Sequence, residues 1–346
     1  MWSSLARTSG GGWTFAKGLT QALVDSTELD VTIVLPKGLD TRELLQDRPC
    51  KVISVRPMVG PAKIVRDLWM INLWARNAKA NVVLVPHEWA SWAGGSLVIN
   101  VIQNILFLHP AGRRLHPVKS ILMRAIAKLS APFVGATIAV SDEARMLWRD
   151  ETGLDAVVVP EGIAGEFART GAAPRDNAVV IMTGNHPHKN PGLARAVADA
   201  LIADEPSMRL TVVGIEGPAD GRAVFIEELS NESLATLFSR TQVVVLTSAV
   251  ESFGLPAFEA HASGCSVVVL AGTAMSEWLG KDPMVSVVAP ESEALVVAVR
   301  RARTFSDNFR IKSDRHSWDT QGPKWVRAIL TIASETSERG PRRWRN

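Results

Sequence analysis

Short apolar runs rich in β-branched residues alternate with longer amphipathic stretches along the whole chain. A first series occupies 31–35, 51–55, 81–85, 97–102, 136–140 and 156–160, and a second series occupies 178–184, 209–214, 241–248 and 266–270. Near-continuous apolar strands separated by helices are typical of parallel sheets that are covered on both faces. The pattern therefore predicts an α/β protein built from doubly wound sheets.

A break in this pattern predicts two domains. The stretch 164–177, "AGEFARTGAAPRDN", is small and polar, and 346 residues exceed the usual size of a single core. We expect two Rossmann-like domains that face a cleft, followed by a closing helix and a basic tail, with bounds at 1–165, 166–315, 316–338 and 339–346. Little sequence precedes the turn Gly10-Gly11-Gly12, which would normally follow a strand, so the first strand is expected to be missing or degraded.

Composition excludes several classes of protein. No apolar run approaches the roughly 18 residues of a membrane span, and the first residues lack the apolar core of a secretory signal. The two cysteines have no metal-ligand spacing, which predicts a cytoplasmic chain without a disulfide scaffold. No G-x-G-x-x-G follows a strand, which disfavours a dinucleotide oxidoreductase. Positive charge without a recognition motif disfavours nucleic-acid binding.

The stretch 250–266, "VESFGLPAFEAHASGCS", contains two acids around a glycine and a proline. Glu251 follows the predicted strand 241–248, and Pro256 suits the first turn of a helix expected at 256–264. The backbone N–H groups of 253–256 would then form an anion site at a helix N-terminus. Glu259, one turn into the helix, could accept two hydroxyls of a diol such as ribose. The alternative is that both acids are solvated residues favoured by the helix dipole.

The stretch 243–269 resembles the Glu-x7-Glu signature of the retaining family 4 glycosyltransferases (glycosyltransferase group 1), which have the GT-B fold. Further blocks in the same order resemble this family, namely 9–23, 135–148, 157–167, 182–198, 229–248, 271–280 and 316–318. The resemblance thus extends over nearly the whole chain. It implies a hexosyltransferase-type enzyme that moves a sugar from a nucleotide-sugar to an acceptor hydroxyl with retention of anomeric configuration. No cofactor and no obligatory metal are expected.

The resemblance also assigns roles to residues of this sequence. Glu259 would hold the ribose hydroxyls, Glu251 would contact the donor sugar, and Lys189 would neutralise the diphosphate. Glu251 and Lys189 are therefore the candidate catalytic residues. The remaining donor-binding candidates are Gly184, Asn185, Ser252, Phe253, Gly254 and Leu255. The candidates for the acceptor or diphosphate loop are Gly11, Gly12, Gln103, Asn104 and His109.

Two departures from the family pattern affect the expected chemistry. The phosphate loop usually carries an Arg before its Lys, but "TGNHPHKN" has Asn185 or His186 there. Either His188 or another base takes its place, or turnover is slow. Relatives often have a His-Asp pair after a strand of the first domain, where this chain has Gln103 and Asn104, with His109 a little later.

The acceptor is expected to be a glycan or a lipid-linked glycan, in the synthesis of cell-surface glycans or glycolipids. In the helix predicted within 111–130, Leu115, Val118, Leu122, Ile126 and Leu129 form one stripe, opposite Arg113, Arg114, Arg124 and Lys128. Either the stripe packs on a sheet and the cations are solvated, or the cations meet an anionic membrane surface. A same-fold alternative is an epimerase or a glycogen-type synthase. An alternative from another class is a weak or inactive nucleotide-sugar-binding scaffold subunit.

Overall fold

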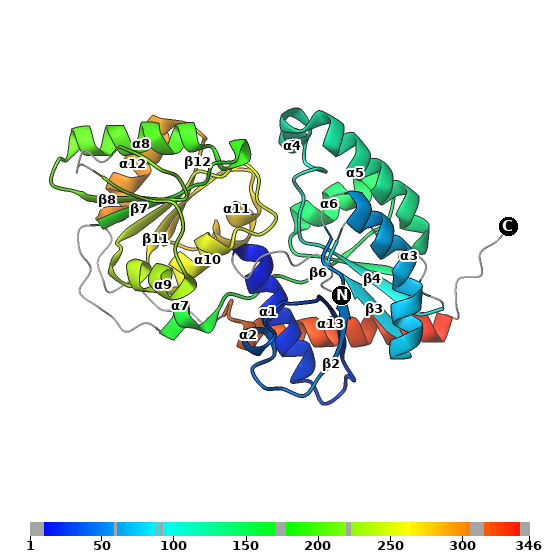
Figure 1. Ribbon diagram of the computed structural model, residues 1–346. Coiled ribbons are helices and arrows are strands. Elements are labelled where there is room, and N and C mark those ends of the chain that lie inside the picture. Colours follow the sequence, from blue (N-terminus) through cyan, green and yellow to red (C-terminus); the bar gives the residue numbers. More distant parts are fainter. Residues whose placement is uncertain are drawn as a thin grey trace. The chain divides into compact units, whose positions relative to one another are not determined.

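The structure is a computed structural model that describes residues 10–58, 61–87, 89, 93, 95–169, 178–218, 223–304 and 315–339. The chain divides into two compact units, each described by itself below (Figure 1). The first unit contains residues 1–108, 118–162 and 318–346, and the second contains 109–117 and 163–317. The chain thus passes between the units at 162/163, where the sequence predicted 165. The segment 109–117, predicted within the first domain, belongs to the second unit.

The second unit is built on one six-stranded parallel sheet in the order β12-β11-β10-β7-β8-β9. The strands are β7 Ala178–Met182, β8 Arg209–Val213, β9 Val224–Ile226, β10 Val243–Leu246, β11 Ser266–Leu270 and β12 Val285–Val288. The helices are α4 Pro110–Leu115, α7 Gly165–Arg169, η2 Pro187–Lys189, α8 Pro191–Asp204, α9 Asn231–Arg240, α10 Leu255–Ala262, α11 Ala274–Leu279 and α12 Ser292–Arg303. Figure 1 shows α8 and α12 on one face of the sheet and α9 and α10 on the other. This arrangement explains why β10 and β11 are buried along their whole length.

The first unit contains two parallel sheets among its described residues, β1-β2 and β3-β4-β5-β6. The strands are β1 Thr32–Pro36, β2 Lys51–Val55, β3 Val82–Val85, β4 Leu97–Ile102, β5 Ala136–Ala139 and β6 Val157–Val158. The helices are α1 Gly11–Val24, α2 Arg42–Leu45, α3 Pro61–Ala78, α5 Pro117–Ser130, η1 Ala131–Phe133, α6 Asp142–Thr152 and α13 Trp318–Arg339. α13, close to the predicted closing helix 316–338, packs against α1.

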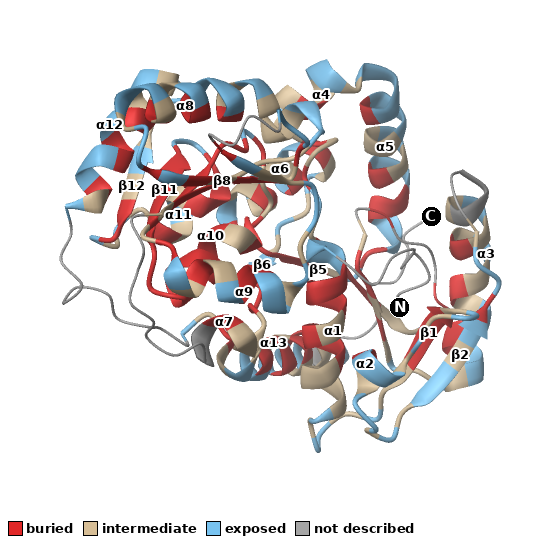
Figure 2. Cartoon of the chain, turned by 60° about the vertical axis from the view of Figure 1, so that its left-hand side comes forward, coloured by how far each residue is buried: buried red, intermediate tan, exposed pale blue. Residues whose placement is uncertain are grey.

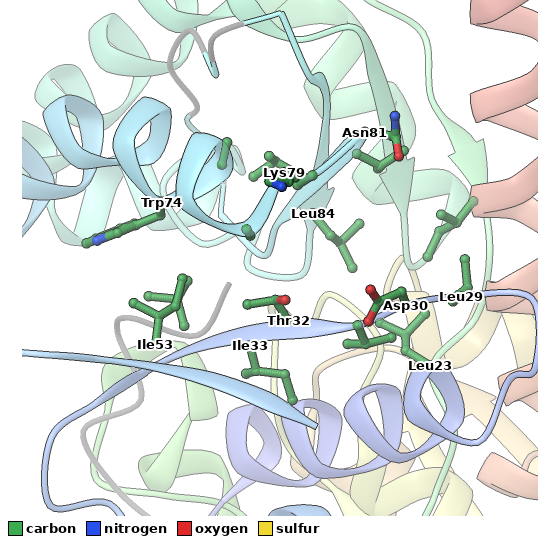
Figure 3. A pocket seen from close by; sticks show the side chains of 18 of the residues that line it. Leu23, Leu29, Asp30, Thr32, Ile33, Ile53, Trp74, Lys79, Asn81 and Leu84 are labelled. Atoms are coloured by element: carbon green, nitrogen blue, oxygen red, sulfur yellow. The ribbon is translucent and has the colours of Figure 1, made fainter. Parts of the chain in front are cut away.

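A cavity of about 340 Å³ lies in the first unit between β1 and β3 (Figure 3). Thr20 and Leu23 of α1 line it from one side, and Ile71 and Trp74 of α3 line it from the other. The sheet of the second unit is continuous, whereas β1-β2 and β3-β6 of the first unit are separate sheets on either side of this cavity. Residues 1–9, where the sequence predicted a missing or degraded first strand, lie outside the described residues. So do residues 340–346 of the predicted basic tail.

The packing of Trp318, at the start of α13, explains why positions 18 and 162 are glycines. Trp318, the first residue of α13, occupies the space that a Cβ at Gly18 or at Gly162 would need, because the nearest Trp318 atoms would lie 2.0 and 2.6 Å away. The Trp325 indole N–H, about two helix turns further on, donates to the Pro160 carbonyl at 2.9 Å. These contacts fix α13 to the first unit at both α1 and the end of β6.

The structure corrects the helix predicted within 111–130. Two helices, α4 and α5, occupy this stretch, and Pro117 begins the second of them. Most of the apolar stripe is exposed and only Ile126 is half-buried, whereas the buried residues of α5 are the small Ser120, Ala127 and Ser130; Figure 2 shows both buried and exposed positions along α5. Small residues on the inward face let the helix lie close to its neighbours. The larger apolar side chains of α5 lie mainly on the opposite face, which is exposed.

Two cations of α5 bind a buried carboxylate instead of being surrounded only by solvent. The Arg124 and Lys128 side chains form ion pairs with buried Glu151 of α6 at 2.5 and 3.1 Å. Burial by itself raises the pKa of the Glu151 carboxyl, but the hydrogen bonds from both cations more than offset burial and leave the pKa below its ordinary value. Within the described ranges, no helix is both long and apolar enough to cross a membrane.

Candidate functional site

The carboxyl ends of two neighbouring strands bring the main predicted site residues together in the second unit. β10 pairs in parallel with β7, and Leu246 lies opposite Met182 at the end of the register. The loop after β7 leads through Gly184 to η2, and the loop after β10 leads through Glu251 to α10. Loops that follow adjacent parallel strands meet at one edge of the sheet, which is where open α/β folds bind ligands.

Lys189 and Glu251 form the centre of this site. The Lys189 ammonium lies 2.5 Å from a carboxylate oxygen of Glu251, and both side chains are partly exposed. The hydroxyls of Thr183 and Thr247 each donate to the Lys189 carbonyl at 2.9 Å, and the Ala249 N–H donates to the His188 carbonyl. The two loops are therefore fastened to each other beneath a charged pair that an anionic ligand could reach.

The turn between Glu251 and α10 requires glycine. Gly254 has φ 89°, in the left-handed region, and a Cβ there would lie 2.2 Å from Cγ of Met275. Phe253 is buried and stacks on Phe258 with ring centroids 4.1 Å apart, so its backbone rather than its ring is available to a ligand. Among the backbone hydrogen bonds of the described residues, none uses the N–H of Phe253, Gly254 or Leu255 as donor.

The expected anion site at the start of α10 needs one correction. The helix runs from Leu255 to Ala262 rather than over 256–264, and Pro256 has no N–H to donate. The Ala257 N–H already donates to the Gly254 carbonyl. The donors that remain for an anion are therefore the N–H groups of 253–255.

Glu259 is buried one turn into α10, with only 4% of its surface exposed. Burial, together with repulsion from Glu166 of α7, raises the pKa of Glu259 to about 8. Near neutral pH its carboxyl is therefore protonated, and a protonated carboxyl can donate one hydrogen bond and accept another. Such a group matches one donor and one acceptor of a vicinal diol, whereas the sequence suggested an acid that accepts from both hydroxyls.

Two histidines, His186 and His188, precede Lys189 in the loop after β7. The rings of His186 and His188 stack with centroids 5.6 Å apart, and Nδ1 of His188 is buried without a hydrogen-bond partner. Burial and the Lys189 charge lower the pKa of His188. Asn185 is exposed and Gly184 half-buried beside the Lys189 side chain. His188 is thus the base closest to Lys189 in the loop where the sequence lacks an arginine.

The predicted acceptor-loop residues do not form one cluster within a single unit. Gly11 and Gly12 are exposed at the start of α1, and half-buried Gln103 and exposed Asn104 follow β4, all in the first unit. His109 belongs to the second unit, where its Nδ1 accepts from the Ala111 N–H at 3.1 Å and caps α4. Burial and Arg113 lower the pKa of His109. The structure therefore shows His109 as the N-cap residue of α4.

Sequence reasoning missed several residues that shape the site. Thr183 and Thr247 hold the two loops together, and each is the first polar residue after an apolar strand, a signal that the sequence did contain. Glu166 and Met275 come from distant segments, and nothing local marks them. Among the described residues, no group of three or more His, Cys, Asp and Glu side chains is placed to hold a metal ion.

Comparison with known proteins finds glycosyltransferases that are similar to this chain, and the family match covers the site described above. Residues 177–304 match the family described as Glycosyl transferases group 1, and this range includes Gly184, Lys189 and the whole stretch from Glu251 to Glu259. A D-inositol 3-phosphate glycosyltransferase of Geodermatophilus obscurus is 30% identical over 239 residues, which cover 56% of this chain and 52% of the relative. The chain therefore spans about half the length of the curated relative that it matches.

Solved structures resemble the chain over nearly its full length. Sucrose-phosphate synthase (tll1590) from Thermosynechococcus elongatus has a TM-score of 0.72 at 17% identity, with 95% of each chain covered. Anabaena Alr3699/HepE, solved in complex with UDP and glucose, has a TM-score of 0.67 at 15% identity and covers 93% of this chain and 97% of its own. At such identities the likeness concerns the fold, which is the parallel α/β architecture of GT-B proteins with two Rossmann-like domains.

Proposed function

We propose that this protein is a glycosyltransferase that moves a sugar from a nucleotide-sugar donor to an acceptor hydroxyl with retention of anomeric configuration. The observation that carries the proposal is the meeting of Lys189 and Glu251 at the end of β7 and β10, beside a helix start that leads to buried Glu259. The match of residues 177–304 to Glycosyl transferases group 1 supports it, because these residues supply all three side chains.

In this proposal the diphosphate of the donor displaces Glu251 from Lys189. The ammonium then neutralises the negative charge that builds up on the leaving nucleoside diphosphate, and the N–H groups of 253–255 add further donors. Glu251, released from the lysine, lies free to hydrogen-bond the donor sugar. Glu259 holds the ribose diol through its protonated carboxyl. The transfer needs no side-chain nucleophile if the acceptor hydroxyl attacks from the face that the diphosphate leaves.

The finer features of the reaction are also part of the proposal. Metal-independent transfer would rely on Lys189 and backbone donors for charge neutralisation. The acceptor would be a glycan or a lipid-linked glycan of the cell surface, and the enzyme would act in the cytoplasm at the inner face of the membrane, where the stretch 111–130 was predicted to make contact. An inactive scaffold is not favoured, because Lys189, Glu251 and Glu259 are all present and gathered in one unit.

Donor binding and donor turnover test the proposal separately. A thermal-shift screen against nucleotides and nucleotide sugars should show stabilisation of the protein by one nucleotide class, and Glu259→Ala should lose that shift. With the donor so identified, Lys189→Ala should lower the rate of transfer by about 100-fold or more, because a cation that stabilises the leaving group is lost. Lys281→Ala, an exposed lysine of the same unit, is the matched control and should keep the rate.

Two results would contradict the proposal. The first is the absence of any shift with every nucleotide at millimolar concentration. The second is a donor that binds without being consumed when a membrane extract supplies the acceptor, and whose binding does not change in Lys189→Ala. That second result would revive the scaffold alternative.

A further inference from the structure

Two helices of the first unit expose large apolar side chains along most of their length. On α5, Val118, Ile121 and Leu129 are exposed, with 79% of the surface of Val118 and 76% of that of Leu129 accessible. On α3, Trp69 is 81% exposed and is flanked one turn away on each side by exposed Val65 and Leu73. These six residues are called the α3–α5 apolar face below. Exposed apolar groups of this size on neighbouring helices mark an interaction surface.

Both helices present this face toward the same side of the unit. α5 connects the adjacent parallel strands β4 and β5, and α3 connects β2 of one sheet to β3 of the other. Figure 1 shows α3 and α5 on the same side of β3 and β4. The apolar residues of α5 fall within a sector of about 100° on the helix, opposite Ser120, Ala127 and Ser130, which pack inward.

The charges around this face are complementary to an anionic surface. Lys119 and Lys128 lie on the two flanks of the α5 stripe, and Arg76 is exposed on α3. The only acid in the two helices is Asp67, which is fully buried and paired with Arg66. A helix with an exposed apolar stripe, flanking cations and no exposed acid is typical of elements that lie in the headgroup region of anionic membranes. Trp69 suits that region, because tryptophan is enriched where apolar and wet environments meet.

We propose that the α3–α5 apolar face docks the first unit onto an anionic lipid membrane by inserting its apolar side chains while Arg76 and Lys119 contact lipid headgroups. This docking does not depend on the proposed transfer reaction. It differs from a purely electrostatic contact of 111–130, because Arg124 and Lys128 are both engaged with buried Glu151 and apolar insertion contributes most of the binding. It also uses α3, which lies outside that stretch.

Co-sedimentation with vesicles rich in phosphatidylglycerol, or made of phosphatidylcholine alone, tests this inference on the full chain. The wild type should partition onto the anionic vesicles, and a triple variant Trp69→Ser, Val118→Ser, Leu129→Ser should bind at least about tenfold more weakly. Lys119→Glu should weaken binding to anionic vesicles by about fivefold or more and leave the weak binding to neutral vesicles unchanged. The control is Val297→Ser, an equally apolar side chain, 54% exposed, on α12 of the second unit, and it should bind like the wild type.

Each other outcome overturns the proposal. Equal binding by the triple variant and the wild type would exclude insertion through this face. If the wild type binds neither kind of vesicle, and light scattering shows a dimer for the wild type but not for the triple variant, the α3–α5 apolar face is an interface between two copies of the chain. A circular-dichroism melt checks that the variants are folded, and Lys119→Glu, a single exposed change, provides an independent test. Thermal stabilisation by the donor nucleotide, measured without vesicles, should be the same for all variants, so failure here is distinguishable from failure of the proposed function.

Discussion

The second unit buries its apolar side chains on both faces of one continuous sheet, whereas the first unit leaves many of them exposed or beside a cavity. In α12, Leu295, Val296 and Val299 point into the core and Arg300 points outward, while in α5 the small residues point inward and the large apolar ones outward. Both helices cover parallel strands, so their backbones do not explain the difference. What separates them is the size of the residues on the packing face.

The cavity adds a second contrast. The main core of the second unit joins residues of β7, β8, β10, β11, α8 and α12 into one cluster. In the first unit the cluster around Ile71 and Val83 is separate from the one around Val34 and Trp74, and the cavity is lined by residues of both (Figure 3). Among the described residues the second unit thus has the larger single core, and yet it contains Glu259, a buried acid whose pKa is raised by burial. Stability is given up there at the candidate site, which is a common compromise in proteins.

The largest expected effect concerns that acid. The pKa of Glu259 rises from 4.5 to about 8 on folding, so the unfolded chain ionises between these values while the folded chain does not. The folded state is therefore destabilised progressively as pH rises from about 5 to 8. Glu259→Gln, which cannot ionise, should be more stable than the wild type by an amount that grows over this range to on the order of 4 kcal/mol.

Urea denaturation at several pH values measures this difference, and Glu293→Gln on the exposed side of α12 is the control, with a change within about 0.5 kcal/mol at every pH. A difference that stays constant from pH 5 to 8 would show that Glu259 is ionised in the folded protein. The same variant should lose nucleotide-induced stabilisation only in part, because an amide can still donate one hydrogen bond and accept another.

The second prediction compares two leucines on helices. Leu201 of α8 is fully buried in the continuous core, and Leu23 of α1 is half-buried at the wall of the cavity. Leu201→Ala should cost about 3–4 kcal/mol of the free energy of unfolding, because it creates a new void in close packing. Leu23→Ala should cost only about 1 kcal/mol, since its side chain already lacks neighbours on one side.

Urea denaturation followed by circular dichroism compares the two variants. If Leu23→Ala costs as much as Leu201→Ala, the cavity is filled in solution and the contrast between the two units is smaller than the structure indicates. A larger loss for Leu201→Ala would support the contrast.

Much of this fold was predictable because apolar runs report burial on two faces. All ten predicted strands are present, with ends that differ by a few residues, as at β10, predicted at 241–248 and observed at Val243–Leu246. The missed strands β9 and β12 are the two edges of the sheet, where half-exposed side chains weaken the apolar pattern. The turn and helix start from Gly254 were predictable, since glycine, proline and strand end lie within a few residues.

What could not be predicted depends on contacts between distant segments. The periodicity of α5 located its apolar stripe, but which side faces the protein was decided by Ser120, Ala127 and Ser130 and by Glu151 on another helix. Likewise the sequence paired Glu251 with Glu259 by spacing, whereas in the structure Glu251 lies against Lys189, 62 positions earlier. The raised pKa of Glu259 required burial and Glu166, neither of which a local motif reveals.

The smallest expected effect tests the contrast between α5 and α12 directly. Ile121 of α5 is exposed and Val296 of α12 is buried, and both are β-branched, so substitution by serine changes helix propensity similarly. Ile121→Ser should alter the free energy of unfolding by no more than about 0.5 kcal/mol, because its side chain gains little burial on folding. Val296→Ser should cost about 2 kcal/mol or more, since it removes buried apolar surface and buries a hydroxyl.

Urea denaturation without lipid measures both variants. A loss for Ile121→Ser that approaches the loss for Val296→Ser would mean that the exposed face of α5 is covered within the protein in solution, and it would then not be available to a membrane. A near-zero loss would mean that selection for stability does not explain isoleucine at this position. The side chain would then be free for contact with something outside the chain, as membrane docking through the α3–α5 apolar face requires.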